Sequence, residues 1–343
     1  MTAGDMMTTR RFLLLFSVLT LLTLLAGCVR QDAAPSSAIP IAGSPAPTLR
    51  RVRLQTDWLP QAEHGGFYQA LVRGYYATAG LDVEILPGGP GATIRPRVAA
   101  GEVEFGLNRS DDIIMSVEQG LPLVITGAFL QHDHLGLLLH ANDPAKTFAD
   151  LNGRTLTVMP GLTWIKFVQK KYGITFNLRP LASGLATFFA DPGDIHQCLL
   201  TSEPFIAARQ GVAVRTLAIA DSGYDIYHVI FTRRAFLRDA PEVVRAFTVA
   251  SLRGWDDYIH GDPTAAHVEI LRRNPDMTAE QLAFSRNELI KRVLVHGDAM
   301  RGDVIGKLSS RRLAEQISVL REFGELKRPI AAPDIVTPDA LAP

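Results

Sequence analysis

This sequence of 343 residues has two cysteines, a formal net charge of zero and few long apolar runs. Its 35 basic residues balance 35 acidic ones. That balance argues against a general nucleic-acid-binding protein, which needs a basic face to neutralise phosphates. The one long apolar run, at residues 12–25, is short for a membrane span of about 20 residues. The sequence also has no Gly-x-Ser-x-Gly, Cys-x-x-Cys or His-Glu-x-x-His motif.

The apolar run belongs to an N-terminal pattern that predicts export. Arg10 and Arg11 precede it, and Leu-Ala-Gly-Cys at residues 25–28 follows it. This order resembles a bacterial lipoprotein signal, in which a peptidase cuts before the cysteine and its sulfur carries a diacylglycerol. We therefore expect a signal peptide over 1–27 and a lipid anchor on Cys28. An ordinary signal peptide with an incidental cysteine is the alternative.

The segment after Cys28 is predicted to be a flexible tether. Residues 28–48 are rich in Pro, Ala and Ser and have no apolar period, so they cannot bury enough surface to fold. Cleavage and acylation would leave Cys198 as the one free thiol. No internal disulfide could form, and the fold must be stabilised by its hydrophobic core. The expected location is the cell envelope, on the periplasmic face or the outer surface of the cytoplasmic membrane.

The rest of the chain has the composition and periodicity of a globular α/β protein. Apolar residues make up 47% of the chain and charged residues 20%, and the length suggests about two domains. Alternating strand patterns, as at 51–56 and 81–87, are separated by helical ones, as at 61–80. This β-α-β series implies mostly parallel sheets with covering helices. The last third is predicted to be helical, at 240–261, 262–274, 278–294 and 309–324.

Five blocks of the body match, in order, the blocks of one protein family. They are TDWLPQAEHGGFYQALVRGYYATAGLDVEI at 56–85, GEVEFGLN at 101–108, FADLNGRTLTV at 148–158, TSEP at 201–204 and RGWDDYIHGDPTAA at 253–266. The chain thus resembles the type 2 periplasmic substrate-binding proteins of ABC importers, in the branch that handles thiamine-pyrimidine precursors. Nitrate-, sulfonate- and taurine-binding proteins are related to this branch. Gln61 and Ser202 stand where the family pattern has Asn.

The resemblance implies a two-lobed protein with ligand in the cleft between the lobes. Each lobe would be a mostly parallel sheet with flanking helices. Lobe one would comprise 48–135 plus 226–335, and lobe two 136–225. The hinge would run through 131–138 and 222–230 and close around a small-molecule ligand. A permease on the same membrane would then recognise the closed form. The binding protein is expected to be a monomer without a cofactor.

Candidate ligand contacts in lobe one follow the strands, because loops converge at the carboxyl ends of the strands. Asp57, Trp58 and His64 come after the first strand, where Trp58 offers a flat face and His64 a donor or acceptor. Asn108, Arg109 and Ser110 come after the strand at 104–108. Arg109 could hold a carboxylate, phosphate or sulfonate, or pair with a neighbouring acid instead.

Candidate contacts in lobe two begin helices. Gly161 and Thr163 precede or open the helix at 162–173, where free N–H groups would face the cleft. Glu203 in TSEP could accept from the exocyclic amine of an aminopyrimidine. Trp58 and Glu203 together favour a pyrimidine or related aromatic heterocycle, whereas Arg109 favours a small anion such as a sulfonate or nitrate. Both ligand classes stay open at this point.

The sequence also allows three other interpretations: an enzyme, a sensor or scaffold, and a metal-binding protein. A eukaryotic branch of the same fold makes the thiamine pyrimidine from its own histidine, and His64 falls in the corresponding block. That enzymatic branch carries a dense cysteine cluster, which this chain lacks, so we expect no catalytic residues. A second alternative is a tethered sensor or scaffold protein. Gln131–His134 contains two histidines and an aspartate, but adjacent residues seldom converge on one ion, so polar hinge residues are favoured and no metal site is predicted.

Overall fold

The computed structural model describes residues 49–342, except residues 90, 182 and 183. The predicted signal peptide at 1–27, the predicted lipid attachment at Cys28 and the predicted tether at 28–48 all lie outside the described residues. Among the helices that the structure describes, none is long and apolar enough to cross a membrane.

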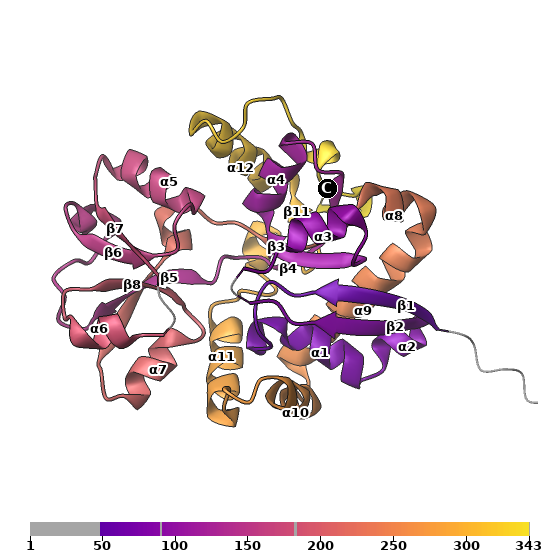
Figure 1. The fold of residues 1–343 in the computed structure, drawn as a ribbon, viewed down its shortest axis with the longest axis horizontal. Coiled ribbons are helices and arrows are strands. Elements are labelled where there is room, and N and C mark those ends of the chain that lie inside the picture. The colour runs from indigo at the N-terminus through magenta and orange to yellow at the C-terminus, as the bar shows by residue number, and fades with distance from the viewer. Residues whose placement is uncertain (1–48, 90, 182–183, 343) are drawn as a thin grey trace, which may run out of the picture. The chain divides into compact units, whose positions relative to one another are not determined.

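Two mixed five-stranded sheets form the body (Figure 1). The first sheet has the order β2-β1-β3-β10-β4 and the second the order β7-β6-β8-β5-β9. In each sheet one strand, β10 or β5, runs antiparallel to both neighbours, so the other four share one direction. The predicted α/β class is therefore confirmed. The strands are β1 (Arg50–Gln55), β2 (Leu81–Leu86), β3 (Phe105–Arg109), β4 (Leu123–Leu130), β5 (Leu135–His140), β6 (Thr155–Val158), β7 (Asn177–Pro180), β8 (Ile195–Leu199), β9 (Val214–Ala218) and β10 (His228–Arg233), with a small pair β11 (Leu308–Ser309) and β12 (Leu341–Ala342).

Helices cover both faces of the first sheet. Alternation along β10 sends Ile230 into a core with α1 and α9, and Val229 and Phe231 into a core with α3, α4 and α12. These helices are α1 (Gly65–Val72), α2 (Tyr75–Thr78), α3 (Ile94–Ala100), α4 (Ser110–Glu118), α8 (Arg234–Asp239), α9 (Pro241–His260), α10 (Thr264–Arg273), α11 (Ala279–Lys291) and α12 (Ser310–Glu322). The first sheet is thus buried on two sides, which leaves its strand ends as the accessible edges.

The second sheet is covered in the same way by shorter helices. One core joins Leu137 and Leu156 to Trp164 of α5 (Thr163–Tyr172). The other joins Leu138 and Cys198 to Phe188 of α6 (Ala186–Ala190), beside α7 (Glu203–Arg209). Cys198 is a free, buried thiol. Short 3-10 helices complete the described chain: η1 (Ala62–His64), η2 (Phe148–Leu151), η3 (Ile219–Ser222), η4 (Ala299–Arg301), η5 (Ala332–Asp334) and η6 (Pro338–Ala340).

The chain passes between the sheets through two crossing segments, residues 131–134 and residues 219–227. On the first sheet, His228 of β10 is in register with Arg109 of β3 and Leu130 of β4. On the second sheet, Leu135 of β5 is in register with Leu199 of β8. The carboxyl ends of β3, β4 and β8 therefore all lie at the crossing segments, and polar residues that follow these strands converge there.

Two glycines set the position of α1 against α9. A Cβ atom on Gly254 would lie 2.2 Å from the carbonyl oxygen of Gly66, and a Cβ on Gly66 would lie 2.2 Å from the ring of Trp255. Only glycine allows the two helix backbones to approach this closely. Because α1 begins immediately after His64, this packing also fixes where the His64 side chain lies.

The structure adds detail to the sequence prediction at the short helices. The helical segment predicted over 61–80 consists of η1, α1 and α2, and Gly74, where a kink was expected, separates α1 from α2 with φ 69°. No residue range was predicted for α7 or α8, although Glu203 was considered as the start of a helix. Both helices are short, so an apolar period over so few residues gives no clear helical signal.

Candidate functional site

The polar site begins at Asp57, two residues after the end of β1. Asp57 Oδ1 lies 2.7 Å from Nε2 of His64, whose ring is almost fully buried. Burial would raise the pKa of Asp57, but the hydrogen bond from His64 and the nearby imidazoles outweigh it and hold that pKa below its usual range. An ionised carboxylate can only accept, so Nε2 carries a proton. The other ring nitrogen, Nδ1 of His64, is buried and has no partner in the described part of the chain.

A second histidine has the same arrangement. His228 Nε2 lies 3.2 Å from Oδ1 of Asp133, which is fully buried on the first crossing segment. Burial would raise the pKa of Asp133, but Arg109 and the hydrogen bond from His228 outweigh it and keep the carboxyl ionised. The other ring nitrogen of His228, Nδ1, is not used by this contact. This atom is buried and unpartnered among the described residues.

His134 completes a group of three buried imidazoles. Its ring lies against that of His228, with centroids 4.4 Å apart. Burial lowers the pKa of His134 to about 3, so the ring is neutral at physiological pH. Its Nδ1 and the Nε1 of Trp164 are likewise buried without a partner in the described structure. Buried polar atoms nearly always have a partner, so the unpartnered Nδ1 atoms of His64, His134 and His228 are candidate ligand contacts.

Two glutamates enter the same network from opposite sheets. Glu63 of η1 is buried and accepts a hydrogen bond from the hydroxyl of Thr201, which follows β8. Glu203 Oε2 accepts from the Leu199 N–H at 2.7 Å. Burial, with a smaller contribution from the charge of Glu63, raises the pKa of Glu203 to about 7. Strongly shifted carboxyl groups in such a setting are typical of functional sites.

The guanidinium of Arg109 is bound by carboxylates on both sides. Its Nε and Nη2 lie 3.2 and 3.1 Å from the two oxygens of Asp111, and its Nη1 lies 3.2 Å from Oδ2 of Asp133. Tyr224 of the second crossing segment donates to Asp111 at 2.6 Å. Arg109 thus ties β3 to both crossing segments, and its hydrogen-bonding fork is engaged by protein acids.

The other predicted residues of lobe one have varied environments. Ser110 is buried, donates to Gln316 at 2.8 Å and accepts from the Tyr227 N–H at 3.1 Å. Asn108 Oδ1 accepts from the Arg109 N–H at 2.8 Å. Trp58 is half-buried and follows Asp57 directly.

On the second sheet, Gly161 is exposed, with φ 83°, and Thr163 is the buried first residue of α5. His64 bonds Asp57 and Arg109 bonds Asp133, whereas Glu203 interacts with Glu63 only through its charge.

Sequence reasoning missed several members of this network. Asp133 and His134 were interpreted only as polar hinge residues, and Glu63, Thr201 and His228 were not considered. The signal available for His228 was its place at the start of the strand predicted over 227–234, which could not be aligned with Arg109 before the strand order was known.

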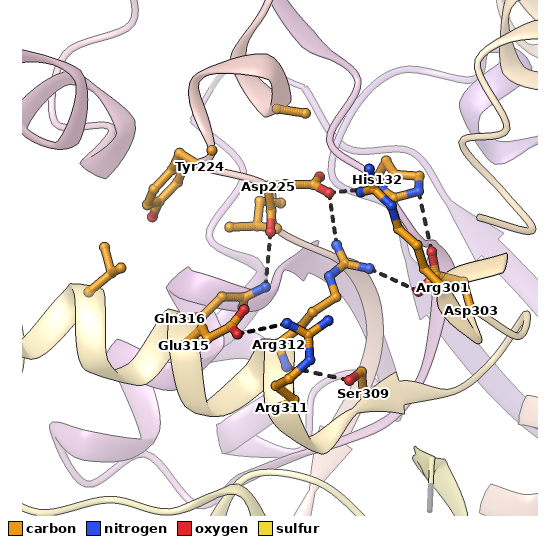
Figure 2. Close-up of a pocket in the computed structure, with 14 residues that line it drawn as sticks. His132, Tyr224, Asp225, Arg301, Asp303, Ser309, Arg311, Arg312, Glu315 and Gln316 are labelled. Atoms are coloured by element: carbon orange, nitrogen blue, oxygen red, sulfur yellow. Dashed lines mark hydrogen bonds and ion pairs between the residues drawn. The ribbon is translucent and has the colours of Figure 1, made fainter. Parts of the chain in front are cut away.

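The crossing segments are also hydrogen-bonded to α12, beside a cavity of about 280 Å³ (Figure 2). Oδ2 of Asp225 lies 2.7 Å from Nδ1 of His132 and 3.0 Å from Nη2 of Arg312. Asp133 N–H donates to the other oxygen of Asp225 at 3.0 Å. Because these groups are bound to one another, the cavity belongs to the junction that supports the crossing segments.

Two sheets joined by two crossing segments, with a polar site where they meet, define the fold of the periplasmic binding proteins. The periplasmic sulfonate-binding protein SsuA of Methylobacillus flagellatus has this fold, with a TM-score of 0.62 and 16% identity, covering 85% of this chain and 92% of that one. Residues 61–266 match the family described as NMT1/THI5 like, and the chain belongs to that family.

Sequence relatives include binding proteins and enzymes. The riboflavin-binding protein RibY of Chloroflexus aurantiacus is 26% identical over 297 residues, which cover 79% of this chain and 82% of RibY. The formylaminopyrimidine-binding protein of Halalkalibacterium halodurans is 24% identical over 334 residues, 93% of this chain and 96% of that protein. A 4-amino-5-hydroxymethyl-2-methylpyrimidine phosphate synthase of Saccharomyces cerevisiae is 22% identical over 246 residues, 66% of this chain and 72% of the enzyme.

Proposed function

We propose that this protein is the extracytoplasmic solute-binding component of an ABC importer and that its ligand is a small aromatic heterocycle bearing N–H donors. The observation that carries the proposal is the pair of buried, unpartnered Nδ1 atoms on His64 and His228. Asp57 and Asp133 engage Nε2 of each ring, so a neutral imidazole here would offer Nδ1 as an acceptor to the ligand. Such a site matches the amine or imide N–H groups of a pyrimidine or a flavin.

The charges of the network favour the heterocycle over a small anion. Asp57, Glu63, Asp133 and Glu203 contribute acidic groups, whereas the guanidinium of Arg109 is already bound to Asp111 and Asp133. A sulfonate or nitrate offers acceptors only, so it would need the donors that this network has used. Two relatives named for binding riboflavin and formylaminopyrimidine support the same class of ligand.

Within this proposal the predicted contacts have different roles. Trp58 would stack on the ring of the ligand, and Glu203 would accept from its amine. Asn108, Gly161 and Thr163 would line the site from the ends of β3 and α5. We assign Arg109 and Ser110 a positioning role, because their side chains are hydrogen-bonded to Asp111, Asp133 and Gln316.

The proposed lobes and hinge follow the predicted boundaries, with 48–135 plus 226–335 as lobe one and 136–225 as lobe two. Three hydrogen bonds in the structure already join the two proposed lobes: Thr201 to Glu63, Gln281 to Ser202, and Ser285 to the Thr201 carbonyl at 2.6 Å. They cross from the end of β8 to η1 and α11. We propose that these contacts belong to the closed form, which a membrane permease would recognise.

We propose binding without catalysis, although the family also includes synthases. Cys198 is the one cysteine of the described residues; it is buried in the second sheet, and burial raises the pKa of its thiol. The Nε2 atom of His64 is engaged by Asp57. Both features suit a site that holds a ligand and releases it unchanged.

The ligand proposal predicts which compounds stabilise the protein. An aminopyrimidine or riboflavin at about 100 times its dissociation constant should add ~2.7 kcal/mol to the free energy of unfolding. The expected rise in melting temperature is about 4 °C. Thermal unfolding against formylaminopyrimidine, riboflavin, taurine, an alkanesulfonate and nitrate measures this effect. A rise with the sulfonate or nitrate alone would contradict the heterocycle, and no rise at millimolar concentrations would contradict the site.

Three matched glutamine substitutions test the histidine acceptors. His64→Gln and His228→Gln keep an N–H that can reach Asp57 or Asp133 but remove the ring Nδ1. Each should weaken binding of the heterocycle about tenfold or more, as expected for one lost hydrogen bond in a buried site. His267→Gln is the control, because His267 bonds Tyr258 at 3.0 Å on α9 and lies outside the network. Equal affinity in all three variants would refute the acceptor assignment.

We also propose that Cys28 anchors the protein by a lipid. Support comes from the Leu-Ala-Gly-Cys sequence after an apolar run and two arginines. Expression in a bacterial host should give a protein in the membrane fraction whose processing is blocked by globomycin. Cys28→Ala should shift the protein to the soluble extracytoplasmic fraction. A wild-type chain that is processed normally with the inhibitor present would contradict the anchor.

A further inference from the structure

We propose that Asp256, His260 and His296 form a binding site for a divalent transition-metal ion of the Zn²⁺ class. The three residues lie on the first-sheet side of the protein, at the end of α9 and in the loop after α11. They are separate from the network of Asp57, His134 and His228, so the proposal does not depend on the proposed ligand or on transport.

The distances between the three side chains suit one metal ion. Oδ1 of Asp256 lies 3.2 Å from Nδ1 of His260 and 3.3 Å from Nε2 of His296. All three potential ligand atoms lie within 4.8 Å of one another. In a tetrahedral zinc site with bonds of about 2.0–2.1 Å, neighbouring ligand atoms are about 3.3 Å apart. A metal ion could therefore replace the two protons now shared with the carboxylate while the side chains move little.

The backbone explains why these residues meet. Asp256 and His260 are four residues apart, so they share one face of α9, and His260 is in its last turn, where the helix dipole favours a cation. His296 is placed by the end of α11. Val293 adopts a left-handed conformation with φ 48°, which is rare for a β-branched residue, and Leu294 and Val295 are buried immediately after it. That turn brings His296 beside α9.

The donor set selects the kind of metal. Two imidazoles and one carboxylate suit Zn²⁺, Ni²⁺ or Cu²⁺, whereas Mg²⁺ and Ca²⁺ prefer oxygen ligands alone. The side chains of Asp256 and His260 are 62% and 64% exposed, so water can occupy the remaining coordination positions. In the described part of the chain, both ion-pair partners of Asp256 are these imidazoles, so no lysine or arginine competes with the metal.

The alternative is a simple hydrogen-bonded group. Exposed pairs of this kind contribute about 0–1 kcal/mol to stability, so such a group would leave little trace in the fold. A metal site differs from it in a measurable way, because metal binding to the folded state alone would raise the melting temperature as the metal concentration rises.

The test uses the full-length chain, purified in detergent without a polyhistidine tag and freed of metal by dialysis against a chelator. Calorimetric titration with Zn²⁺ should show one ion bound per chain, with Mg²⁺ and Ca²⁺ giving no heat of binding at the same concentrations. His260→Ala, His296→Ala and Asp256→Asn should each weaken Zn²⁺ binding at least tenfold. A Co²⁺ titration should give a visible absorption band of tetrahedral type that the double variant His260→Ala/His296→Ala lacks.

Two controls separate this site from other histidines. His267→Gln removes a neighbouring histidine outside the group, and His64→Gln removes one from the buried network. Both should bind Zn²⁺ as tightly as the wild type. The proposal is overturned if the wild type binds no Zn²⁺ at millimolar concentrations, or if the double variant binds it unchanged. It is also overturned if His64→Gln, but not the double variant, abolishes binding, because the ion would then lie in the buried network.

Discussion

Replacing Arg109 with methionine is expected to lower the free energy of unfolding by about 3–5 kcal/mol at neutral pH. The side chain of Arg109 is 10% exposed and that of Asp133 is fully buried. Methionine would fill much of the same space, but it would leave Asp111 and Asp133 without their cation. An uncompensated buried carboxylate is costly because the low-dielectric interior cannot solvate it. Chemical denaturation, with the slope against denaturant held comparable, measures the loss.

The loss in Arg109→Met should depend on pH with a definite sign. The pKa of Asp133 lies below its unfolded value, so its ionisation contributes stability above about pH 4 that is lost as the pH falls through the folded pKa. Removing Arg109 removes much of that contribution. The difference between wild type and variant should therefore be largest near pH 7 and shrink below about pH 4.

Arg51→Met is the matched control for this substitution. Arg51 pairs with Glu84 at 2.8 Å, but the two side chains are 70% and 42% exposed, so the loss should stay below about 1 kcal/mol. Equal losses in the two variants would show that Arg109 is not a buried anchor of the crossing segments. A loss for Arg109→Met that did not change between pH 7 and pH 3 would contradict the role assigned to Asp133.

Much of the fold could be predicted because its elements are periodic and local. β1, β2 and the long helix α9 each carry an apolar pattern over enough residues to be assigned from the chain alone. The positions of Asp57 just after β1 and of Arg109 at the end of β3 also follow from local pattern, because strands end where the alternation ends. Candidate residues could therefore be named before the structure was known.

The contacts among those candidates depend on strand order, which local pattern does not contain. His228 meets Asp133 because β10 inserts antiparallel between β3 and β4, 95 residues after Asp133. The same register turns Arg109 towards Asp133, so Arg109 pairs with protein acids, which was one of the two roles considered for it. His260 and His296 likewise meet only through the packing of α9 and the strained turn at Val293, which no spacing rule predicts.

Replacing Glu203 with glutamine is expected to stabilise the fold while weakening ligand binding. Burial raises the pKa of Glu203 from 4.5 to about 7, so its carboxyl contributes stability below the unfolded pKa that is lost as the pH rises through 7. Glutamine does not titrate, and its carbonyl oxygen can still accept from the Leu199 N–H. Allowing for the partial exposure of Glu203, the variant should exceed the wild type by about 1–3 kcal/mol at pH 8.

The sign of this change distinguishes a functional carboxylate from a structural one. Glu118 provides the opposite case, because backbone N–H groups of Arg328 and Lys327 donate to it and lower its pKa. Glu118→Gln should therefore be less stable than the wild type at pH 8, while Glu203→Gln is more stable. Denaturation at pH 5 and pH 8 measures both, and the advantage of Glu203→Gln should disappear at pH 5.

Binding then separates the two roles of Glu203. If its carboxylate accepts from the amine of the ligand, Glu203→Gln should bind the heterocycle about tenfold or more weakly, because a charge-assisted hydrogen bond is lost. Destabilising groups of this kind are commonly found where function requires them. A variant that was more stable yet bound every compound as tightly as the wild type would show that Glu203 does not contact the ligand. A variant less stable than the wild type at pH 8 would show that Glu203 is a structural cap of α7.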